Sequence, residues 1–442
     1  MQRLEALPLQ SGLARLSSSG MLRCSTAGSV DDGKSTLIGR LLFDAKSILQ
    51  DQIEAVQKVS DRRGFAGLDL ALLTDGLIAE REQGITIDVA YRYFATARRK
   101  FILADTPGHE QYTRNMVTGA STADLAIILV DASKGVLTQS RRHAYIANLL
   151  GIEHLVVAVN KMDLVSFSQA AFDAIVRDFE AFVAPLGVRH LHFLPLSALH
   201  GDMVVERGER LNWYRGPTLL ELLETAPNPD YAHNAPLRFP VQKVMRPQTP
   251  EWRDFRGYMG RIETGQIRVG DAITVLPSGV SSRIAGIHTF DGDREQARAG
   301  QSVTLTVADH VDISRGDMIV HCDQLPRVDK NLEATLCWMG EEPLSLQRRY
   351  VLKHTTRVVK ALVSELRHRV DVDTLEPQKA STLQMNDIGR VHLRTQQPLV
   401  WDPYSADRFT GAFILIDDTS NRTVAAGILT GAADGESVDG LG

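Results

Sequence analysis

The stretch that decides the fold is Gly28-Ser29-Val30-Asp31-Asp32-Gly33-Lys34-Ser35-Thr36. It matches the phosphate-binding pattern G-x-x-x-x-G-K-[ST] at every fixed position. Two glycines let the backbone curl into a nest whose N–H groups converge on an anion, and the helix that begins near Lys34 adds the partial positive charge of its N-terminus. We expect Lys34 to reach the β- and γ-phosphates of a nucleotide and the Ser35 hydroxyl to hold Mg²⁺.

Around this loop, strand-like and helical segments alternate. The predicted strands are residues 22–27, 89–95, 101–104, 125–130, 155–159 and 191–196, and the predicted helices include 111–119, 138–150 and 168–184. Such alternation is typical of an α/β P-loop domain with a mostly parallel sheet and helices on both faces. Ligands of such sheets bind beyond the carboxyl ends of the strands, so motifs at those ends are the candidate site.

The pattern changes after Leu223. Residues 226–230 have the composition of a linker, and beyond them short strands such as 272–276, 386–393 and 412–416 alternate with frequent turns. This is typical of antiparallel β-barrels. The predicted organisation is a disordered extension (1–20), a nucleotide-binding P-loop domain (21–226), two β-barrel domains (236–326 and 328–431) and a flexible tail (432–442).

A second phosphate motif, Asp105-Thr106-Pro107-Gly108, follows a predicted strand. An acid at a strand end can hold Mg²⁺ through water, and the Gly108 N–H can sense a γ-phosphate. Thr86 is the candidate switch residue whose hydroxyl completes the Mg²⁺ shell when the triphosphate is bound. His109, directly after Gly108, is the candidate residue for orienting the attacking water.

The motif Asn160-Lys161-Met162-Asp163 predicts which base is bound. Asp163 can accept from two donors on the guanine edge, which adenine does not offer. A site built on such hydrogen bonds discriminates by roughly 10⁴–10⁵-fold. We expect Asn160 to buttress the loop and the Lys161 stem to cover the base. Ser197-Ala198-Leu199 completes the pocket with a backbone N–H near the guanine oxygen.

Composition is that of an ordinary soluble globular protein of 442 residues, with 43% hydrophobic and 23% charged residues. A net charge of −5, from 54 acids and 49 bases, argues against broad nucleic-acid binding. No apolar run is long enough to span a bilayer. Three widely spaced cysteines, Cys24, Cys322 and Cys337, indicate a cytoplasmic protein, and we expect all three to be buried. The first residues lack the apolar core of a secretory signal.

The order of these motifs, followed by two β modules, resembles the translational GTPases of the elongation-factor type. Within that group, residues 28–42, 75–94 and 104–122 resemble the GTPase subunit of sulfate adenylyltransferase. Ser133-Lys134-Gly135-Val136 and residues 238–242 and 289–294 carry the same resemblance. Elongation factors usually have histidine or serine where this chain has Asp32, so the Asp31-Asp32 pair is the more discriminating detail.

The resemblance implies that GTP hydrolysis, with GTP and Mg²⁺ as cofactors, is coupled to formation of adenosine 5′-phosphosulfate and pyrophosphate from ATP and sulfate. The adenylyl transfer is expected on a smaller ATP-using catalytic subunit, with neither a membrane nor a nucleic acid as partner. Matching positions give phosphate and Mg²⁺ roles to Gly33, Lys34, Ser35, Thr36, Asp105 and Gly108, base recognition to Asn160, Lys161 and Asp163, and hydrolysis to His109. Asp31 matches a position that helps to hold a monovalent cation in related GTPases. No second P-loop pattern follows, so we expect no adenylylsulfate kinase activity.

Two other functions compete with this one. A translation factor that delivers aminoacyl-tRNA would need a basic groove, and the second β module carries Arg327, Lys330, Arg348, Arg349, Lys353, Arg357, Lys360, Arg367 and Arg369. Glu341, Glu342 and Glu365 interleave with that run, which is also typical of a solvated face. An ATP-dependent kinase or ATPase would use the same P-loop, but the Asn160–Asp163 motif argues against it.

Overall fold

The computed structural model describes residues 20–62, 68–73, 86, 88–109, 112–227, 235–246 and 255–432. Residues 1–19 of the predicted extension, residues 433–442 of the predicted tail, and most of the segments 74–87 and 226–230 therefore lie outside the described residues. The chain divides into two compact units, of which the first contains the phosphate-binding loop and the second contains the β modules.

The strands predicted for the first unit form one sheet. They are β1 (Met21–Ala27), β2 (Ala90–Ala95), β3 (Lys100–Asp105), β4 (Leu125–Asp131), β5 (His154–Asn160) and β6 (His190–Pro195). Their order is β2-β3-β1-β4-β5-β6, with all neighbours parallel except the edge pair of β2 and β3. β4 and β5 are buried along their whole length, as strands are when both faces of a parallel sheet are covered.

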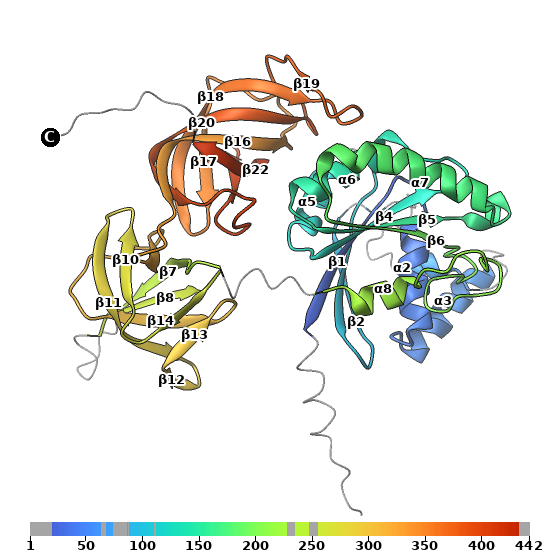
Figure 1. The fold of residues 1–442 in the computed structure, drawn as a ribbon, viewed down its shortest axis with the longest axis horizontal. Helices are drawn as coiled ribbons and strands as arrows, with labels where there is room; N and C mark the ends of the chain where they lie inside the picture. Colours follow the sequence, from blue (N-terminus) through green and yellow to red (C-terminus); the bar gives the residue numbers. More distant parts are fainter. Residues whose placement is uncertain are drawn as a thin grey trace, which may run out of the picture. The chain divides into compact units, whose positions relative to one another are not determined.

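Helices cover both faces of this sheet. They are α2 (Lys34–Asp44), α3 (Gln50–Arg62), α5 (Thr113–Ala120), α6 (Thr138–Leu149), α7 (Gln169–Val183) and α8 (Leu219–Thr225), with short 3-10 turns at η1 (Leu70–Leu73), η3 (Met162–Val165) and η4 (Ala184–Leu186). Figure 1 shows α5, α6 and α7 on one face and α2, α3 and α8 on the other. The apolar residues Leu37, Ile38, Leu41 and Leu42 of α2 are buried. The helix α8 begins at a capping box between Thr218 and Glu221. No helix among the described residues is both long and apolar enough to cross a bilayer.

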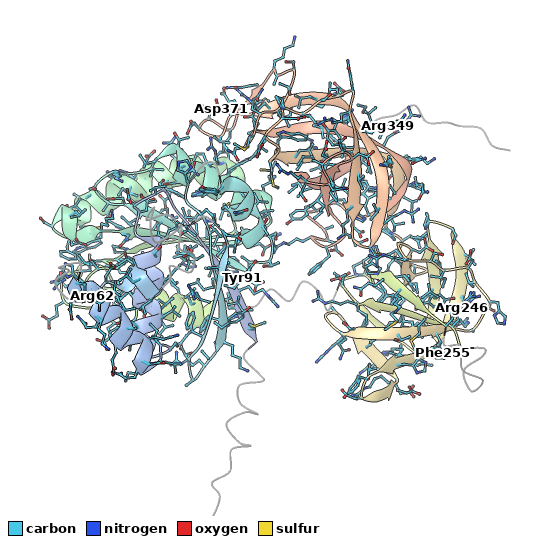
Figure 2. The ribbon with its side chains drawn as sticks, turned by 180° about the vertical axis from the view of Figure 1, so that it is seen from behind. Arg62, Tyr91, Arg246, Phe255, Arg349 and Asp371 are labelled. Carbon is cyan, nitrogen blue, oxygen red and sulfur yellow. The ribbon has the colours of Figure 1, made fainter. Side chains whose placement is uncertain are left out.

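The edge strand β2 leaves aromatic side chains in solvent. Tyr91 is 43% exposed and Tyr93 is 71% exposed, whereas Phe94, on the opposite face, is buried against Phe101 of β3. Figure 2 marks Tyr91 on this strand. The alternation follows from the two-residue period of a strand.

The first β module is a closed antiparallel barrel. Its strands are β7 (Phe239–Met245), β8 (Gly257–Arg261), β10 (Ala272–Leu276), β11 (Val280–Thr289), β14 (Ser302–Val307) and β15 (Met318–His321). The short strand β12 (Gly292–Arg294) pairs with β11, and β9 (Gln266–Arg268) and β13 (Gln296–Arg298) form a separate two-stranded sheet. The ring runs β10-β15-β7-β8-β14-β11 and is closed by pairing of β11 with β10. Phe239, Tyr258 and Leu305 lie in its core.

The second β module closes in the same way. Its strands are β16 (Arg327–Trp338), β17 (Arg349–His354), β18 (Arg357–Val370), β20 (Ile388–Trp401), β21 (Ala412–Asp417) and β22 (Thr423–Ala432), with β19 (Pro377–Gln378) attached to β18. The ring runs β17-β21-β22-β16-β20-β18 and closes between β18 and β17. The predicted fold class, an α/β P-loop domain followed by two antiparallel barrels, is confirmed.

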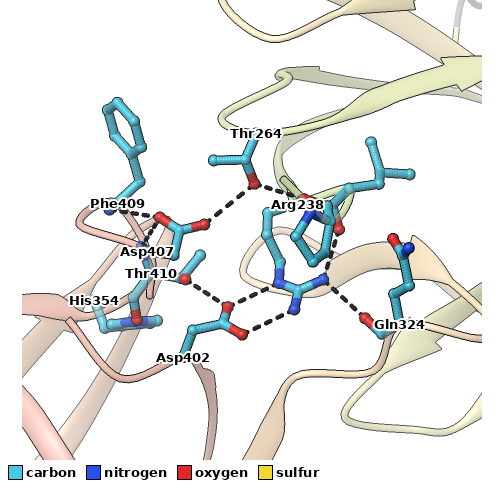
Figure 3. Close-up of polar contacts among 10 residues, drawn as sticks. Arg238, Thr264, Gln324, His354, Asp402, Asp407, Phe409 and Thr410 are labelled. Atoms are coloured by element: carbon cyan, nitrogen blue, oxygen red, sulfur yellow. Dashed lines mark hydrogen bonds and ion pairs between the residues drawn. The ribbon is translucent and has the colours of Figure 1, made fainter. Parts of the chain in front are cut away.

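A buried arginine joins the two barrels (Figure 3). Arg238, just before β7, makes a two-pronged ion pair with Asp402, with both N···O distances at 2.8 Å. Its remaining nitrogen donates to the backbone oxygens of Leu237 and Gln324, each at 2.9 Å. Thr410 donates to the same Asp402 carboxylate at 2.6 Å. Although burial alone would raise the pKa of Asp402, the hydrogen bonds from Arg238 and Thr410 hold it below its usual value.

Five of the nine basic residues named above form ion pairs with acids: Arg348, Arg357, Lys360, Arg367 and Arg369. Arg348 lies 2.7 Å from Glu342 and 3.1 Å from Asp417, and Arg367 lies 3.4 Å from Glu365. Arg349, at the start of β17, is exposed (Figure 2). This pairing matches the solvated face that the interleaved acids predict rather than a continuous basic groove.

Two predictions need correction. Cys24 and Cys337 are buried as expected, but Cys322 is exposed because it stands in the turn after β15, where strand pairing has ended. The strand expected over residues 386–393 starts later, at Ile388, because Asn386 adopts a left-handed turn conformation with φ of 73°. It continues to Trp401, where it pairs with Arg327 of β16.

We predict that Arg238→Ala lowers the free energy of unfolding of the two-barrel unit by about 3–5 kcal/mol, because it leaves the Asp402 carboxylate without its counter-ion. The matched control is Arg367→Ala, whose ion pair with Glu365 is half exposed and should contribute less than about 1 kcal/mol. Hydrogen exchange of barrel amides in the full chain measures both. Equal protection in the two variants would contradict the prediction.

Candidate functional site

The phosphate-binding loop joins β1 to α2 and has the conformation that its glycines require. Gly33 caps α2 with φ of 91°, in the left-handed region that favours glycine. A Cβ atom on Gly33 would lie 2.5 Å from Nδ2 of Asn160. The Asp32 carboxylate accepts the Ser29 N–H at 2.6 Å and so fixes the turn from within. Val30, Ser35 and Thr36 are half-buried, and Asp31 is exposed.

Buried charge is concentrated in this loop. The Lys34 ammonium donates to the backbone oxygens of Gly28 and Ser29, at 2.8 and 3.0 Å. Burial lowers the pKa of Lys34, against the opposing influence of the Asp105 and Asp32 carboxylates. Burial also raises the pKa of Asp32, of which one oxygen has no hydrogen-bond partner among the described residues. These charges lie in the loop that the sequence predicts to bind phosphate.

The second phosphate motif packs directly against the first. Asp105 ends β3 and is buried, and the Thr106 hydroxyl donates to the Thr26 oxygen of β1 at 2.5 Å. A Cβ atom on Gly108 would lie 2.3 Å from both the Gly28 oxygen and the Lys34 ammonium. Only glycine allows this approach, so the structure brings the two predicted phosphate motifs into one place.

Asn160 connects the phosphate loop to the base motif. It is buried at the end of β5. Its Nδ2 donates to the Asp32 backbone oxygen at 2.8 Å, and its Oδ1 accepts the Ala198 N–H at 3.0 Å. One amide side chain therefore holds three segments that lie far apart in the sequence.

The base motif is held by the loop that follows β6. The Ser197 hydroxyl donates to the Asp163 carboxylate at 2.6 Å, which orients that acid. Arg40 of α2 donates to the backbone oxygens of Ala198 and Leu199, at 3.1 and 2.7 Å. The Leu199 side chain is 49% exposed, so this residue contributes to the loop through its backbone.

Two predicted residues lie at the margin of this arrangement. His109 follows Gly108, is half-buried, and has its ring 6.0 Å from that of Tyr112. Thr86 is half-buried and precedes β2 by four residues, but most of the segment around it lies outside the described residues. The roles of both residues stay predictions.

Sequence reasoning missed several residues of the site. Asp131 ends β4 beside Asn160 and contacts Lys161, and its place after a buried strand is the signal that could have found it. Gln139 and His143 stand at helical i,i+4 spacing on α6, where Gln139 lies 3.3 Å from the Gly108 oxygen and 3.0 Å from His143 Nε2. No sequence pattern could have identified Arg40, because its partners are backbone atoms about 160 residues away in the chain.

Three family models match the chain in order. They are "Elongation factor Tu GTP binding domain" over residues 19–228, "Elongation factor Tu domain 2" over 258–320, and "GTP-eEF1A C-terminal domain-like" over 331–430. The fold and the site therefore define a GTP-binding protein of the elongation-factor class. "Sulfate adenylyltransferase subunit 1" of Bacteroides fragilis is 54% identical to this chain over 92% of it and 86% of the relative. The chain belongs to the sulfate adenylyltransferase subunit 1 family.

Further relatives support this assignment. "Sulfate adenylyltransferase subunit 1" of Aeromonas salmonicida is 53% identical over 95% of this chain and 89% of the relative. "Bifunctional enzyme CysN/CysC" of Mycobacterium tuberculosis is 54% identical over 92% of this chain and 67% of the relative. The resemblance predicted from the motifs is confirmed, and it is favoured over an aminoacyl-tRNA carrier.

We predict that His143 makes the first unit sensitive to acid. Burial, with the Lys34 and Arg142 charges, lowers the pKa of His143 to about 3 from 6.5. In the unfolded chain the His143 ring is therefore protonated below pH 6.5, whereas in the folded protein it stays neutral down to about pH 3. The His143 contribution to stability is complete above pH 6.5 and falls by up to about 1.4 kcal/mol per pH unit below it.

His143→Gln removes this titration while keeping an acceptor for Gln139. The free energy of unfolding of the first unit should then depend less steeply on pH than in the unaltered chain. Hydrogen exchange of the β4 and β5 amides, measured from about pH 5 to about pH 7.5, tests this. The exposed His200 serves as the matched control, and His200→Gln should keep the original slope. The same slope for His143→Gln and the unaltered chain would refute the prediction.

Proposed function

We propose that this chain is the GTP-hydrolysing regulatory subunit of a sulfate adenylyltransferase. It couples GTP hydrolysis to synthesis of adenosine 5′-phosphosulfate and pyrophosphate from ATP and sulfate on a smaller, ATP-using partner subunit in the cytoplasm. The observation that supports this best is the double hydrogen bond of Asn160, to Asp32 at 2.8 Å and from Ala198 at 3.0 Å. It unites a phosphate loop with a base-reading loop, and family membership connects that site to sulfate activation.

The proposed phosphate site uses residues 28–36 with Asp105 and Gly108. Lys34 and the loop N–H groups bind the phosphates, and the Gly108 N–H contacts the γ-phosphate. Ser35, Thr86 and Asp105 would hold Mg²⁺, whose preference for oxygen ligands fits their hydroxyl and carboxylate groups. The ion would neutralise phosphate charge when bound. His109 orients the attacking water, at the edge of the site where Gly108 approaches the phosphate loop.

The proposed base site uses Asn160, Lys161 and Asp163 with residues 197–199. The Asp163 carboxylate accepts from the two guanine donors, and Ser197 keeps it in place through the 2.6 Å hydrogen bond. The Ala198–Leu199 backbone, held by Arg40, presents an N–H to the guanine oxygen. An adenine would leave the Asp163 carboxylate without donors, which is the physical basis of discrimination.

Coupling needs a partner that distinguishes the two nucleotide states. The sulfate–phosphate anhydride is strongly uphill, so its formation requires a second, favourable reaction. A switch protein links the two reactions when its GTP and GDP states bind the partner with different affinities. Loss of the γ-phosphate would release Gly108 and the segment that follows it.

We predict that Asp163→Asn moves the base preference from guanine to xanthine. An asparagine offers one donor in place of one acceptor, which complements the additional oxygen of xanthine. Affinities of the purified chain for GTP and xanthosine triphosphate, measured by competition with a fluorescent nucleotide, test this. An unchanged preference for GTP would count against the base site, and equal binding of ATP by the unaltered chain would exclude it.

We predict that GTP raises the yield of adenosine 5′-phosphosulfate by the reconstituted two-subunit enzyme. His109→Ala should abolish this increment, because hydrolysis should fall by about 10²–10⁴-fold, while nucleotide affinity should stay the same. Pyrophosphate and phosphate release, followed in parallel, measure both reactions. If the rate of product formation were the same with and without GTP, the proposed coupling would be wrong, while the GTPase assignment would stand.

A further inference from the structure

The carboxyl end of β4 carries a buried acid with no place in the predicted phosphate and base motifs. Asp131 is the last residue of β4, and its side chain is 1% exposed. Its Oδ1 accepts the Ser133 N–H at 2.9 Å and the Ser133 hydroxyl at 2.6 Å. Its Oδ2 lies 2.9 Å from the Lys161 ammonium. Each oxygen of this carboxylate is therefore held in a fixed direction.

The turn after β4 is built around this acid. The Lys134 and Gly135 N–H groups both donate to the Asp131 backbone oxygen at 3.0 Å. Gly135 has a φ of 72°, and a Cβ atom there would meet no atom of the described residues within 4 Å. Backbone conformation rather than space therefore favours glycine. This turn gives a structural purpose to the Ser133-Lys134-Gly135 segment, which resembles the corresponding part of the family.

Lys161 is fixed at both ends. Its backbone is left-handed, with φ of 58°, between the base-motif residues Asn160 and Met162. Its ammonium is fixed by Asp131. The Ala132 N–H donates to the Asn160 oxygen at 2.9 Å and so holds the end of β4 against the end of β5. The aliphatic stem of Lys161 therefore spans a set path beside the base-reading residues.

We propose that Asp131 is a positioning residue of the guanine site, which orders the Lys161 stem before the base arrives. The inference rests on the proposed guanine site and deepens it. A free lysine loses rotamer freedom when its stem packs on a ligand, and that loss weakens binding. Asp131 removes the loss in advance, so it should affect GDP and GTP alike and leave the hydrolytic step unchanged.

A second route from Asp131 to the nucleotide has to be separated from this one. Burial is the main cause of the raised pKa of Asp32, but the Asp131 charge contributes in the same direction. Loss of Asp131 could thus alter the phosphate loop without involving Lys161. The two routes differ in one respect: a route through Lys161 disappears when Lys161 has no ammonium.

Asp131→Asn is the first test, because asparagine keeps the shape and the acceptor for Ser133 but turns an NH₂ group toward Lys161. We expect the Kd of the full chain for GDP and for GTP to rise about tenfold, with the maximal rate of GTP hydrolysis unchanged. The matched control is Lys134→Met, because Lys134 is a half-exposed cation 4.0 Å from the same carboxylate oxygen. It should leave both affinities unchanged. Unaltered affinity in Asp131→Asn would overturn the proposal.

A double-mutant cycle with Lys161→Met decides the route. Lys161→Met should weaken GDP binding by a similar factor, and adding Asp131→Asn should weaken it no further. A full additional loss in the double variant would overturn the proposal. If Asp131→Asn does not fold, Lys161→Arg and Lys161→Met test the proposal instead. Arginine keeps the ion pair with Asp131, so Lys161→Arg should retain affinity for GDP. Equal losses of GDP affinity in Lys161→Arg and Lys161→Met would overturn the proposal.

This experiment also separates failure of the inference from failure of the proposed function. An unaltered chain that binds ADP as tightly as GDP would invalidate the guanine site itself. An unaltered chain that prefers GDP, combined with a neutral Asp131→Asn, would invalidate the Asp131 role alone.

Discussion

The structure of the first unit depends on one buried amide. Asn160 stands at the end of β5, an interior strand of the sheet, and uses both ends of its side chain, toward the Asp32 oxygen and the Ala198 N–H. A buried amide with an unmatched donor or acceptor would cost about 1–3 kcal/mol, so the loops that meet there have little freedom to separate. The phosphate loop and the base loop thus share one anchor, and a ligand that spans both meets a site assembled beforehand.

Buried charge is the second theme of this site. Lys34, Asp32, Asp105 and Asp131 are all withdrawn from water at one edge of the sheet. Burial dominates the pKa shifts of Asp32 and Lys34. For Asp131, burial alone would raise the pKa, but the hydrogen bonds from Ser133 and Lys161 hold it below its usual value. The balance leaves a strongly polar edge on the first sheet, next to the buried apolar residues of β4 and β5.

The second unit also contains a buried pair of charges, which lies at the interface between its two barrels. Arg238 and Asp402 form a desolvated pair between the barrels, and Leu276, Met318 and Val320 of the first barrel pack with Val400 of the second. A buried ion pair specifies geometry more than it adds stability, because no other arrangement satisfies both charges. Two barrels connected by a short segment therefore keep one defined interface. The surface charges of the second barrel, by contrast, are paired in solvent and fix little.

The sequence by itself determined the strand order along the chain, the positions of the phosphate and base motifs, and the two β modules, because these follow from local periodicity and from motif chemistry at strand ends. It left open every contact whose partners are distant in the chain. Arg40 with the Ala198 and Leu199 oxygens, Asp131 with Lys161, and Arg238 with Asp402 exist because folding brings separate segments to one place. The exposure of Cys322 and the extension of β20 to Trp401 were likewise decided by where strand pairing ends in space. The local sequence pattern determines which interactions a side chain is able to make. The tertiary structure decides which residue becomes its partner, because hydrogen bonds and ion pairs act over only a few ångströms.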